Sequence, residues 1–267
     1  MISDILADYM ENPLKEHYIC YFDILGYRAF FESDTKAHKN FLAKVELTCA
    51  SIHSVIRNAQ LPIKVNCKTY SDNFLLYFEK SIGESEALKI LINLIRKISV
   101  KLLSELEVLI RGAITVGEFY ADEDIVFGEG LVNAVELEEK TAINPRVVID
   151  EKKFNVDLNE FLSNNLIVKD ADDIIFINYF NSVDALKLTR GKCIKLINNH
   201  GRYHPTVKEP KKIQQSERVI SKYIWLLVHF NNQCRILGSP NLLIDYELRI
   251  NDRLIKTEVR AKSLANK

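Results

Sequence analysis

Two short apolar segments, each bordered by an aspartate, limit the folds open to this chain. Residues 18–22 are apolar and end at Asp23, and residues 74–78 follow Asp72 in the turn at 70–73. Runs of this length suit buried strands, so each carboxylate is expected where a strand meets water. If the two strands are neighbours, the aspartates form an oxygen-rich site of the kind that Mg²⁺ prefers.

Composition excludes several classes of protein. The chain has 267 residues, of which 47% are hydrophobic and 27% are charged, and its 36 basic and 36 acidic residues balance. This balance gives no case for duplex nucleic acid or an anionic membrane as a partner. No run approaches the roughly 20 apolar residues of a membrane span. The acidic N-terminus is unlike a signal peptide, and the five scattered cysteines are typical of a reducing compartment. We therefore expect a cytoplasmic protein.

The order of expected elements predicts an α+β fold. Apolar runs and alternation favour strands at 18–22, 63–67, 74–78, 108–116, 125–127 and 146–149, and helical spacing favours helices at 36–58, 84–104 and 131–141. The resulting order is βαββαβ followed by a further βαβ unit, which is the ferredoxin-like plan with an addition. In this plan the first and third strands are antiparallel neighbours, so Asp23 at the end of one meets Asp72 at the start of the other.

We expect three regions along the chain. Residues 1–16 are predicted to form a leader helix, residues 17–150 the α+β core, and residues 151–267 a mainly helical extension packed on the core. Within the extension, the patterns predict helices near 151–163, 183–199 and 214–234, and strands at 174–177 and 246–250. The basic tail at 253–267 is expected to be mobile.

The segment from Asp23 to Arg28 combines several groups that can bind a nucleotide. The Asp23 carboxylate can hold a metal ion, the backbone amides of Leu25, Gly26 and Tyr27 can face a phosphate, and Arg28 can add a charge-assisted contact. The structural alternative is that Asp23 caps the next helix. Asp72 has its own alternative, because hairpin turns favour aspartate for conformational reasons. Together, two carboxylates with two metal ions can support in-line displacement at phosphorus.

Four segments, in the same order along the chain, resemble the motifs of class III nucleotidyl cyclases. They are Phe22-Asp-Ile-Leu-Gly-Tyr27, Lys68-Thr-Tyr-Ser-Asp72, Arg111-Gly-Ala-Ile-Thr-Val-Gly117 and Phe127-Gly-Glu-Gly-Leu-Val-Asn-Ala-Val-Glu-Leu-Glu138. The resemblance covers about residues 17–150. It implies Mg²⁺ or Mn²⁺, two ions per site, held by Asp23, Asp72 and the Ile24 carbonyl. It also implies a head-to-tail homodimer with shared active sites, in which a ribose 3′-hydroxyl attacks the α-phosphorus of a nucleoside triphosphate.

The chain departs from the family pattern at the transition-state residues. Alignment on Gly128 places Val132 and Glu136 where the family has an asparagine and an arginine, and Asn133 lies one residue away. A glutamate cannot replace an arginine, because it accepts hydrogen bonds and carries the opposite charge. Another cation must serve, with Arg28, Arg111 and Arg146 as candidates, or the protein is slow or inactive. The run of Glu136, Glu138 and Glu139 is interpreted as including a solvated helix face.

The base-reading positions also depart from the family pattern. The lysine and aspartate that read adenine in adenylyl cyclases correspond to Lys68 and to the apolar Ile125. An apolar side chain cannot accept a hydrogen bond from a purine amine, which disfavours ATP. The overall pattern is similar to the bacterial pyrimidine cyclases of Pycsar anti-phage systems, which make cyclic UMP or cyclic CMP for a separate effector protein. Lys68 and Tyr70 would then face the base, with Ile125 and Asn133 beside the base and ribose. The structural alternative is that Lys68 is a solvated lysine of a strand and that Tyr70 is an ordinary tyrosine of the sheet.

Two rival functions remain open from the sequence. One is a purine cyclase of the same mechanism, and the other is a catalytically silent, cyclase-like regulator that binds nucleotide, which Val132 and Glu136 favour. A ferredoxin-like RNA-binding domain is disfavoured, because such domains present a basic sheet face with exposed aromatic residues.

Overall fold

The computed structural model describes residues 13–26, 35–201, 210–251 and 256–262. The chain forms two compact units: Met1–Ile95 with Ile110–Ile177, and Arg96–Leu109 with Asn178–Lys267. The second unit thus combines an internal segment, Arg96–Leu109, with the C-terminal part of the chain. Across the described ranges, no helix combines the length and the apolar character needed to cross a bilayer.

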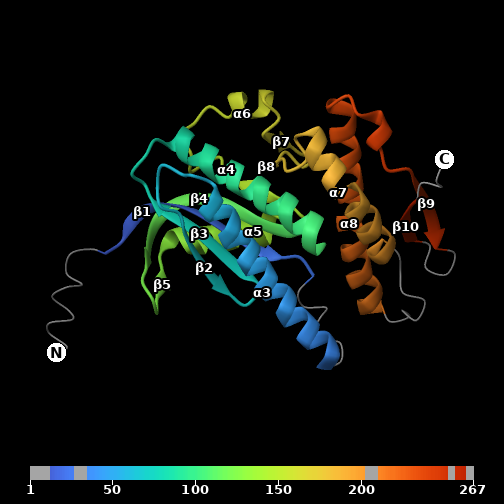
Figure 1. Ribbon diagram of the computed structural model, residues 1–267, viewed down its shortest axis with the longest axis horizontal. Helices are drawn as coiled ribbons and strands as arrows, with labels where there is room; N and C mark the ends of the chain where they lie inside the picture. Colours follow the sequence, from blue (N-terminus) through green and yellow to red (C-terminus); the bar gives the residue numbers. More distant parts are fainter. Residues whose placement is uncertain (1–12, 27–34, 202–209, 252–255, 263–267) are drawn as a thin grey trace. The chain divides into compact units, whose positions relative to one another are not determined.

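The first unit is built on one mixed sheet (Figure 1), whose strands have the order β2-β3-β1-β4-β6-β8-β7, with β5 paired to β4. The strands are β1 (Lys15–Ile24), β2 (Asn66–Tyr70), β3 (Asn73–Glu79), β4 (Ile110–Ala121), β5 (Val126–Phe127), β6 (Val147–Ile149), β7 (Ile167–Lys169) and β8 (Ile175–Ile177). Only β4 and β6 pair in parallel among these neighbours. The predicted α+β class with a ferredoxin-like βαββαβ core is confirmed.

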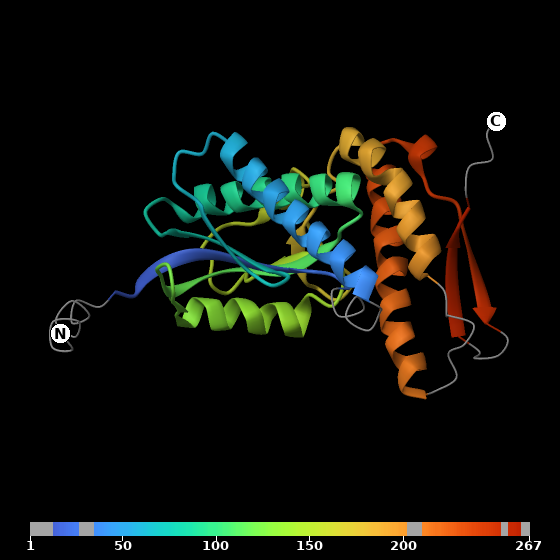
Figure 2. The ribbon, with the colours of Figure 1, turned by 60° about the horizontal axis from the view of Figure 1, so that its bottom comes forward.

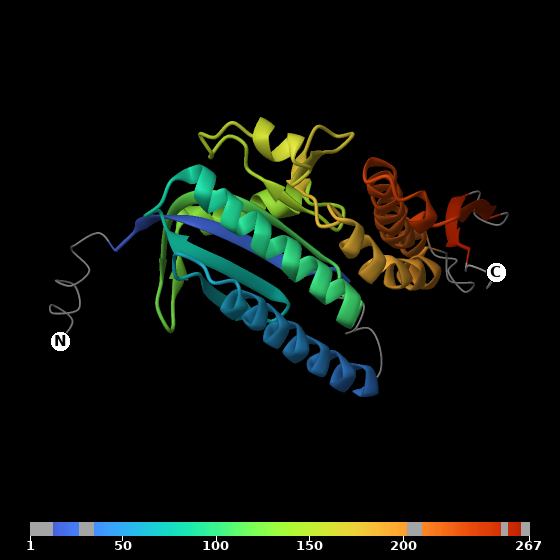
Figure 3. The same ribbon diagram turned by 45° about the horizontal axis from the view of Figure 1, so that its top comes forward.

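Helices cover both faces of this sheet. Figures 2 and 3 show α3 (Thr35–Asn58) and α4 (Glu84–Lys101) over one face, and Figure 2 shows α5 (Glu129–Thr141) on the other. The buried residues of α4 include Leu88, Leu91 and Ile95. Their spacing of three and four residues places them on one stripe of the helix, which is the pattern expected for a helix packed on a sheet.

Strand β1 sends alternate side chains to the two faces of the sheet. Tyr18 and Phe22 stack on the aromatic rings of Phe154 and Phe74. Ile19 belongs to the opposite cluster, in which it packs with Ala134 of α5 and with residues of the neighbouring strands. Because Asp23 has the same parity as Ile19, the fold carries its carboxylate to the α5 face of the sheet.

Two glycines allow α5 to approach the sheet very closely. A Cβ atom at Gly117 of β4 would lie 2.8 Å from the Cα atom of Gly130 of α5. A Cβ atom at Gly130 would lie 2.4 Å from the Cδ1 atom of Ile19. Both distances are shorter than van der Waals contact, so no side chain fits between helix and strand at this point. The depth of α5 on the sheet is therefore set by backbone contact.

The second unit is mainly helical, as predicted for the C-terminal region. It contains α7 (Val183–His200), α8 (Pro210–Ile236), the single-turn segments Leu102–Leu106 and Pro240–Leu242, and the hairpin of β9 (Tyr246–Asn251) and β10 (Lys256–Ala261). Polar contacts join these parts. Arg190 donates to the carbonyl oxygens of Leu242 and Leu243, and Asn231 both donates to and accepts from the backbone of Ile244.

The structure corrects three predictions about the second half of the chain. Residues 256–261 are not mobile, because they form β10, in which Val259 and Ala261 are buried. The helix expected near 151–163 is limited to α6 (Asn159–Ser163). Strand β7 was not predicted, because its three residues are too short to establish a pattern. The leader helix predicted for residues 1–16 falls mostly outside the described residues, and β1 already begins at Lys15.

Candidate active site

Strand pairing brings Asp23 and Asp72 together, as the element order predicts. In the antiparallel pair of β1 and β3, Asp23 lies opposite Asn73, the residue that follows Asp72. The backbone amide of Ile24 donates to the carbonyl oxygen of Asp72 at 3.2 Å. A hydrogen bond thus joins the end of β1 to the turn before β3. The two aspartates lie in adjacent positions where these two strands meet.

The turns that carry these residues have special backbone conformations. Ser71 has a φ of 60°, and Gly26, which follows Asp23 by three residues, has a φ of 91°. Glycine adopts this region at little cost, whereas other residues rarely do. Among the described residues, a Cβ atom at Gly26 would meet nothing within 4 Å.

Arg111 of β4 pairs directly with Asp23. The two residues are opposite each other in the antiparallel register of β1 and β4. The Nε atom of Arg111 donates to both carboxylate oxygens, at 3.0 and 3.1 Å, and its Nη2 atom donates to Oδ2 at 2.8 Å. The same Nε atom lies 2.9 Å from Oε1 of Glu138 on α5. One guanidinium is therefore shared between a carboxylate of the sheet and a carboxylate of the helix.

The charges of the described residues at this site do not balance. Three carboxylates (Asp23, Asp72 and Glu138) surround one guanidinium, so the fully ionised cluster has a formal charge of −3 + 1 = −2. Burial and the charge of Asp23 raise the pKa of Asp72. Burial opposes the charged form of Arg111, but its hydrogen bond to Asp23 and the nearby carboxylates outweigh this effect and raise its pKa. The site therefore carries an excess of negative charge that a divalent cation would neutralise.

Tyr21 lies next to this charge. Burial, followed by the charges of Asp23, Glu138 and Asp72, raises the pKa of its phenol to about 12. The phenol therefore keeps its proton and donates it to Oδ1 of Asn73 at 2.7 Å. This hydrogen bond links β1 to the first residue of β3 and helps to fix the turn that contains Asp72.

The donor set fits Mg²⁺ or Mn²⁺. Carboxylate and carbonyl oxygens are the preferred ligands of these ions, and one or two protein carboxylates suffice when water and phosphate complete the coordination. Asp23, Asp72 and the Ile24 carbonyl are such donors. No group of three histidine, cysteine or acidic side chains in the described part of the chain could hold a metal ion by itself.

The residues predicted to face the base are partly brought together. The Nζ atom of Lys68 donates to the carbonyl oxygens of Asp122 and Glu123, in the turn that leads to Ile125. Ile125 is about half exposed, and its amide donates to Oδ1 of Asp122 at 2.7 Å. Lys68 is therefore held against the segment that presents Ile125. Tyr70 ends β2 with its side chain largely exposed, beside the Ser71–Asp72 turn.

The remaining predicted residues have other surroundings. The amide of Asn133 donates to Oε1 of Glu129 at 3.0 Å, within α5. Val132 is exposed, and Glu136 pairs with Lys140 at 2.6 Å on the same helix. Leu25 and Gly26 form the turn after β1. Tyr27 and Arg28, which the sequence also assigns to phosphate binding, lie outside the described residues.

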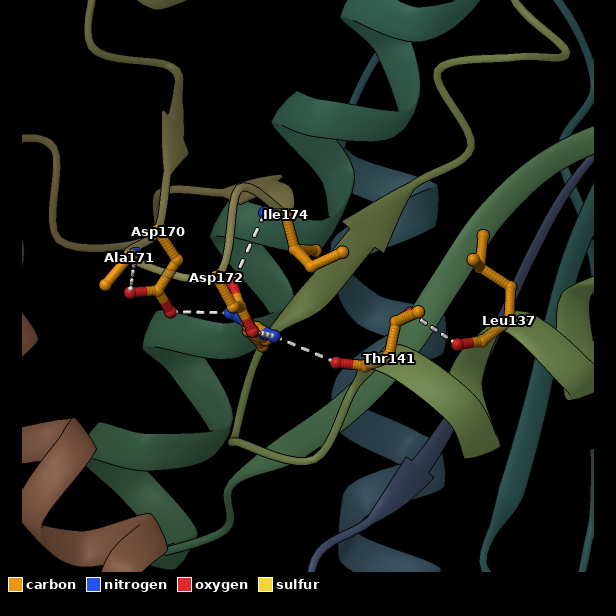
Figure 4. A network of polar contacts seen from close by, with 7 residues as sticks. Leu137, Thr141, Asp170, Ala171, Asp172 and Ile174 are labelled. Atoms are coloured by element: carbon orange, nitrogen blue, oxygen red, sulfur yellow. Dashed lines mark hydrogen bonds and ion pairs between the residues drawn. The ribbon is translucent and has the colours of Figure 1, made fainter.

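Arg146 is wrong as a candidate for the missing transition-state cation. Its side chain is only 1% exposed, and it donates to Asp170, to Asp172 and to the carbonyl oxygen of Thr141. Figure 4 shows these acceptors gathered around the one guanidinium. Its face also contacts the ring of Phe176. Arg146 is thus committed to holding α5, β6 and the β7–β8 turn together.

Glu138 was not singled out from the sequence, although the solvated face expected of the acidic run is present at Glu136 and Glu139. The buried residues of α5 are Gly130, Ala134 and Glu138, each four positions after the last. This spacing places all three on one stripe of a helix. The signal was therefore present in the sequence, where it was hidden by the neighbouring acidic residues Glu136 and Glu139, which are exposed.

Comparison with known proteins gives only distant structural matches. No family model and no curated protein matches the chain. The guanylyl cyclase domain of the RhoGC fusion protein from the aquatic fungus Blastocladiella emersonii is 12% identical, with a TM-score of 0.44 over 61% of this chain and 95% of that one. The adenylyl cyclase CyaB from P. aeruginosa is 12% identical, with a TM-score of 0.41 over 61% and 92%. An adenylate/guanylate cyclase/hydrolase from Silicibacter pomeroyi is 17% identical, with a TM-score of 0.42 over 61% and 95%.

Proposed function

We propose that the protein is a metal-dependent nucleotidyl cyclase that converts a pyrimidine nucleoside triphosphate, UTP or CTP, to a 3′,5′-cyclic nucleotide and pyrophosphate. The observation that carries this proposal is the pairing of β1 with β3, which joins Asp23 and Asp72 at one edge of the sheet. The excess negative charge there supports the binding of divalent cations. The four segments that resemble class III cyclase motifs support the choice of reaction.

Each residue of the site has a proposed role. Asp23, Asp72 and the Ile24 carbonyl would hold two Mg²⁺ or Mn²⁺ ions. When bound, these ions would supply a lowered pKa at the attacking 3′-hydroxyl and neutralisation of the leaving pyrophosphate. The backbone amides of the turn at 25–27, with Arg28, would bind the phosphates. Arg111 is the proposed replacement for the missing transition-state arginine, because it is the described candidate that lies beside Asp23.

The preference for a pyrimidine rests on the base-facing residues. Ile125 presents an exposed apolar side chain where an adenylyl cyclase has an acceptor for the purine amine. Lys68, held next to this segment, remains as a polar group for the base, with Tyr70 nearby and Asn133 on the ribose side. The resemblance to Pycsar cyclases supports the same choice, and with it a homodimer with shared sites, an anti-phage role and a separate effector that reads the cyclic product.

Incubation of the purified protein with UTP, CTP, ATP or GTP and Mn²⁺, followed by chromatography and mass spectrometry, tests the proposal. We expect cyclic UMP or cyclic CMP, with pyrophosphate in equal amount. Asp72→Ala should abolish formation of the cyclic product. The control variant Glu139→Gln, at an exposed residue of α5, should leave product formation unchanged. Cyclic AMP or cyclic GMP as the main product would replace the pyrimidine assignment by the purine alternative.

A catalytically silent regulator is the second candidate. The positions that hold the ribose and transition-state residues in the family are occupied by an exposed valine, Val132, and by Glu136, which pairs with Lys140. Nucleotide binding that depends on Asp72, with no cyclic product and no pyrophosphate from any of the four triphosphates, would favour this alternative.

A further inference from the structure

Arg111 and a metal ion compete for the same oxygen atoms. The guanidinium donates to both oxygens of Asp23, which is only 14% exposed. A divalent ion that uses Asp23 as a ligand would compete with Arg111 for the lone pairs of these oxygens. In displacing it, the ion would also leave a partly buried guanidinium without its main counter-charge, which is costly unless another anion is available.

Glu138 is placed to provide that anion. Its side chain is 3% exposed, and Oε1 is already 2.9 Å from the Nε atom of Arg111. A buried carboxylate is expensive without a cation beside it. Helix α5 therefore places the buried carboxylate of Glu138 within reach of Arg111. A small rotation of the guanidinium would exchange Asp23 for Glu138 without moving the backbone.

We propose that Glu138 is a positioning residue that accepts Arg111 when Asp23 takes up a divalent cation. Without metal, Arg111 neutralises Asp23 and shares its Nε atom with Glu138. With metal, the cation neutralises Asp23 and Asp72, and Arg111 pairs with Glu138. For the three described carboxylates, the arginine and a first divalent ion, the total formal charge is then −3 + 1 + 2 = 0, so each of these charges has a partner. This inference rests on the metal site of the proposed function.

A double-variant cycle measures the exchange without any catalytic reaction. Mn²⁺ affinity is determined by electron paramagnetic resonance for the wild type, Glu138→Gln, Arg111→Met and the two changes together. We expect Glu138→Gln to weaken Mn²⁺ binding about tenfold, because Arg111 then stays on Asp23, a size typical of coupling between residues in contact. In the Arg111→Met background, Glu138→Gln should change the affinity by less than about twofold. Glu139→Gln, on the exposed side of α5, should have no effect.

Two outcomes would overturn the proposal. One is an unchanged Mn²⁺ affinity in Glu138→Gln. The other is an equal loss in both backgrounds, which would mean that Glu138 attracts the ion directly. Thermal melting of each variant, followed by circular dichroism, identifies any variant that does not fold.

Nuclear magnetic resonance of the wild type provides a test that needs no folded variant. With ¹⁵N-labelled arginine, the Nε–Hε signal of Arg111 should shift as Mg²⁺ is added and should remain protected from solvent exchange. An unshifted signal at saturating Mg²⁺ contradicts the exchange. Because these readouts follow metal binding alone, the exchange can hold in a protein that makes no cyclic nucleotide, and it can fail in an active cyclase.

Discussion

Arg111 and Arg146 lie in the same compact unit and both contact two carboxylates, yet their surroundings differ. Arg146 is 1% exposed, and its two Nη atoms are occupied by Asp170, Asp172 and a backbone carbonyl. Arg111 is 27% exposed and has more carboxylate around it than it can neutralise, since Asp72 adds a third negative charge to those of Asp23 and Glu138. The Nη donors of Arg146 are all bonded to groups of the protein, whereas Arg111 is shared between two carboxylates.

This difference distinguishes an arginine with a structural role, Arg146, from a candidate functional arginine, Arg111. A buried arginine whose Nη donors all bond to groups of the protein stabilises the arrangement of those groups and is not available for another ligand. An arginine at a site with excess negative charge marks a place where a cation or a reacting group is expected, because the unpaired charge costs folding free energy that binding recovers. The predictions below test whether this distinction holds.

The largest effect is expected on the reaction itself. Arg111→Met combined with Glu138→Gln, which avoids leaving Glu138 unpaired, should lower the rate of cyclic-nucleotide formation by about 100- to 1000-fold, as the loss of a transition-state charge contact typically does. Product formation is measured by chromatography under saturating Mn²⁺. Arg146→Met, assayed per folded molecule at low temperature, is the matched control and should keep near-normal activity. Equal losses in the two variants would remove the functional distinction between the arginines.

The next effect concerns the free energy of unfolding. Arg146→Met should lower it by about 3 kcal/mol, because Asp170 and Asp172 lose the cation that draws the β7–β8 turn onto β6. Urea unfolding followed by circular dichroism measures the change. The Arg111→Met and Glu138→Gln double variant leaves Asp23 without its cation but removes the more deeply buried carboxylate, and it should lose less than Arg146→Met. A larger loss in the double variant would make Arg111 the more important structural residue.

A smaller and pH-dependent effect is expected at Asp172. Its hydrogen bond with Arg146 lowers its pKa. The pair therefore stabilises the fold fully above the ordinary aspartate pKa of about 3.9 and loses this contribution as the pH falls toward the lowered value. Asp172→Asn should reduce the free energy of unfolding at pH 7 by roughly 0.7 kcal/mol, since solvent screens a half-exposed pair. If the deficit measured by urea unfolding persists unchanged at pH 2.5, the ion pair is not its cause.

The smallest effect is expected at Asp72, where a substitution should increase the free energy of unfolding instead of lowering it. Burial and the charge of Asp23 raise its pKa, so its ionised form destabilises the fold at neutral pH. Without metal, Asp72→Asn should increase the free energy of unfolding at pH 7 by roughly 0.3 kcal/mol after solvent screening. The gain should vanish as the pH falls through the raised pKa, because the wild-type carboxyl is then neutral. With saturating Mn²⁺, the wild type should become the more stable protein. A loss of stability in metal-free Asp72→Asn would contradict the charge excess.

Much of the fold and the central pair of the site were accessible from the sequence. Asp23 and Asp72 could be placed together because, in a βαββαβ unit, the order of elements determines which strands are neighbours. Arg111 could be chosen as a candidate cation, but its contact with Asp23 depends on the exact register of β1 and β4. A shift of one residue would send the two side chains to opposite faces of the sheet, and the sequence pattern does not determine register at that precision.

Charged residues explain the main errors. Glu138 was passed over as a member of an acidic run that includes a solvated face, although its spacing from Ala134 and Gly130 marks the buried stripe of α5. The tail at 253–267 was predicted to be mobile because of its basic residues, yet Val259 and Ala261 alternate with charged neighbours and bury one face of β10. In both segments the period of the pattern was a better guide than the average polarity.

The contact between Gly117 and Gly130 has a consequence for how the chemistry could be tuned. Gly130 precedes Glu138 by eight residues, which corresponds to about 12 Å along a helix. A methyl group at Gly130 would collide with Ile19 and β4 and would lift the first turn of α5. The far end of the helix would tilt with it and alter how deeply the glutamate reaches toward the guanidinium. The volume of one uncharged residue near the start of α5 would thus influence an electrostatic contact near the other end of the helix.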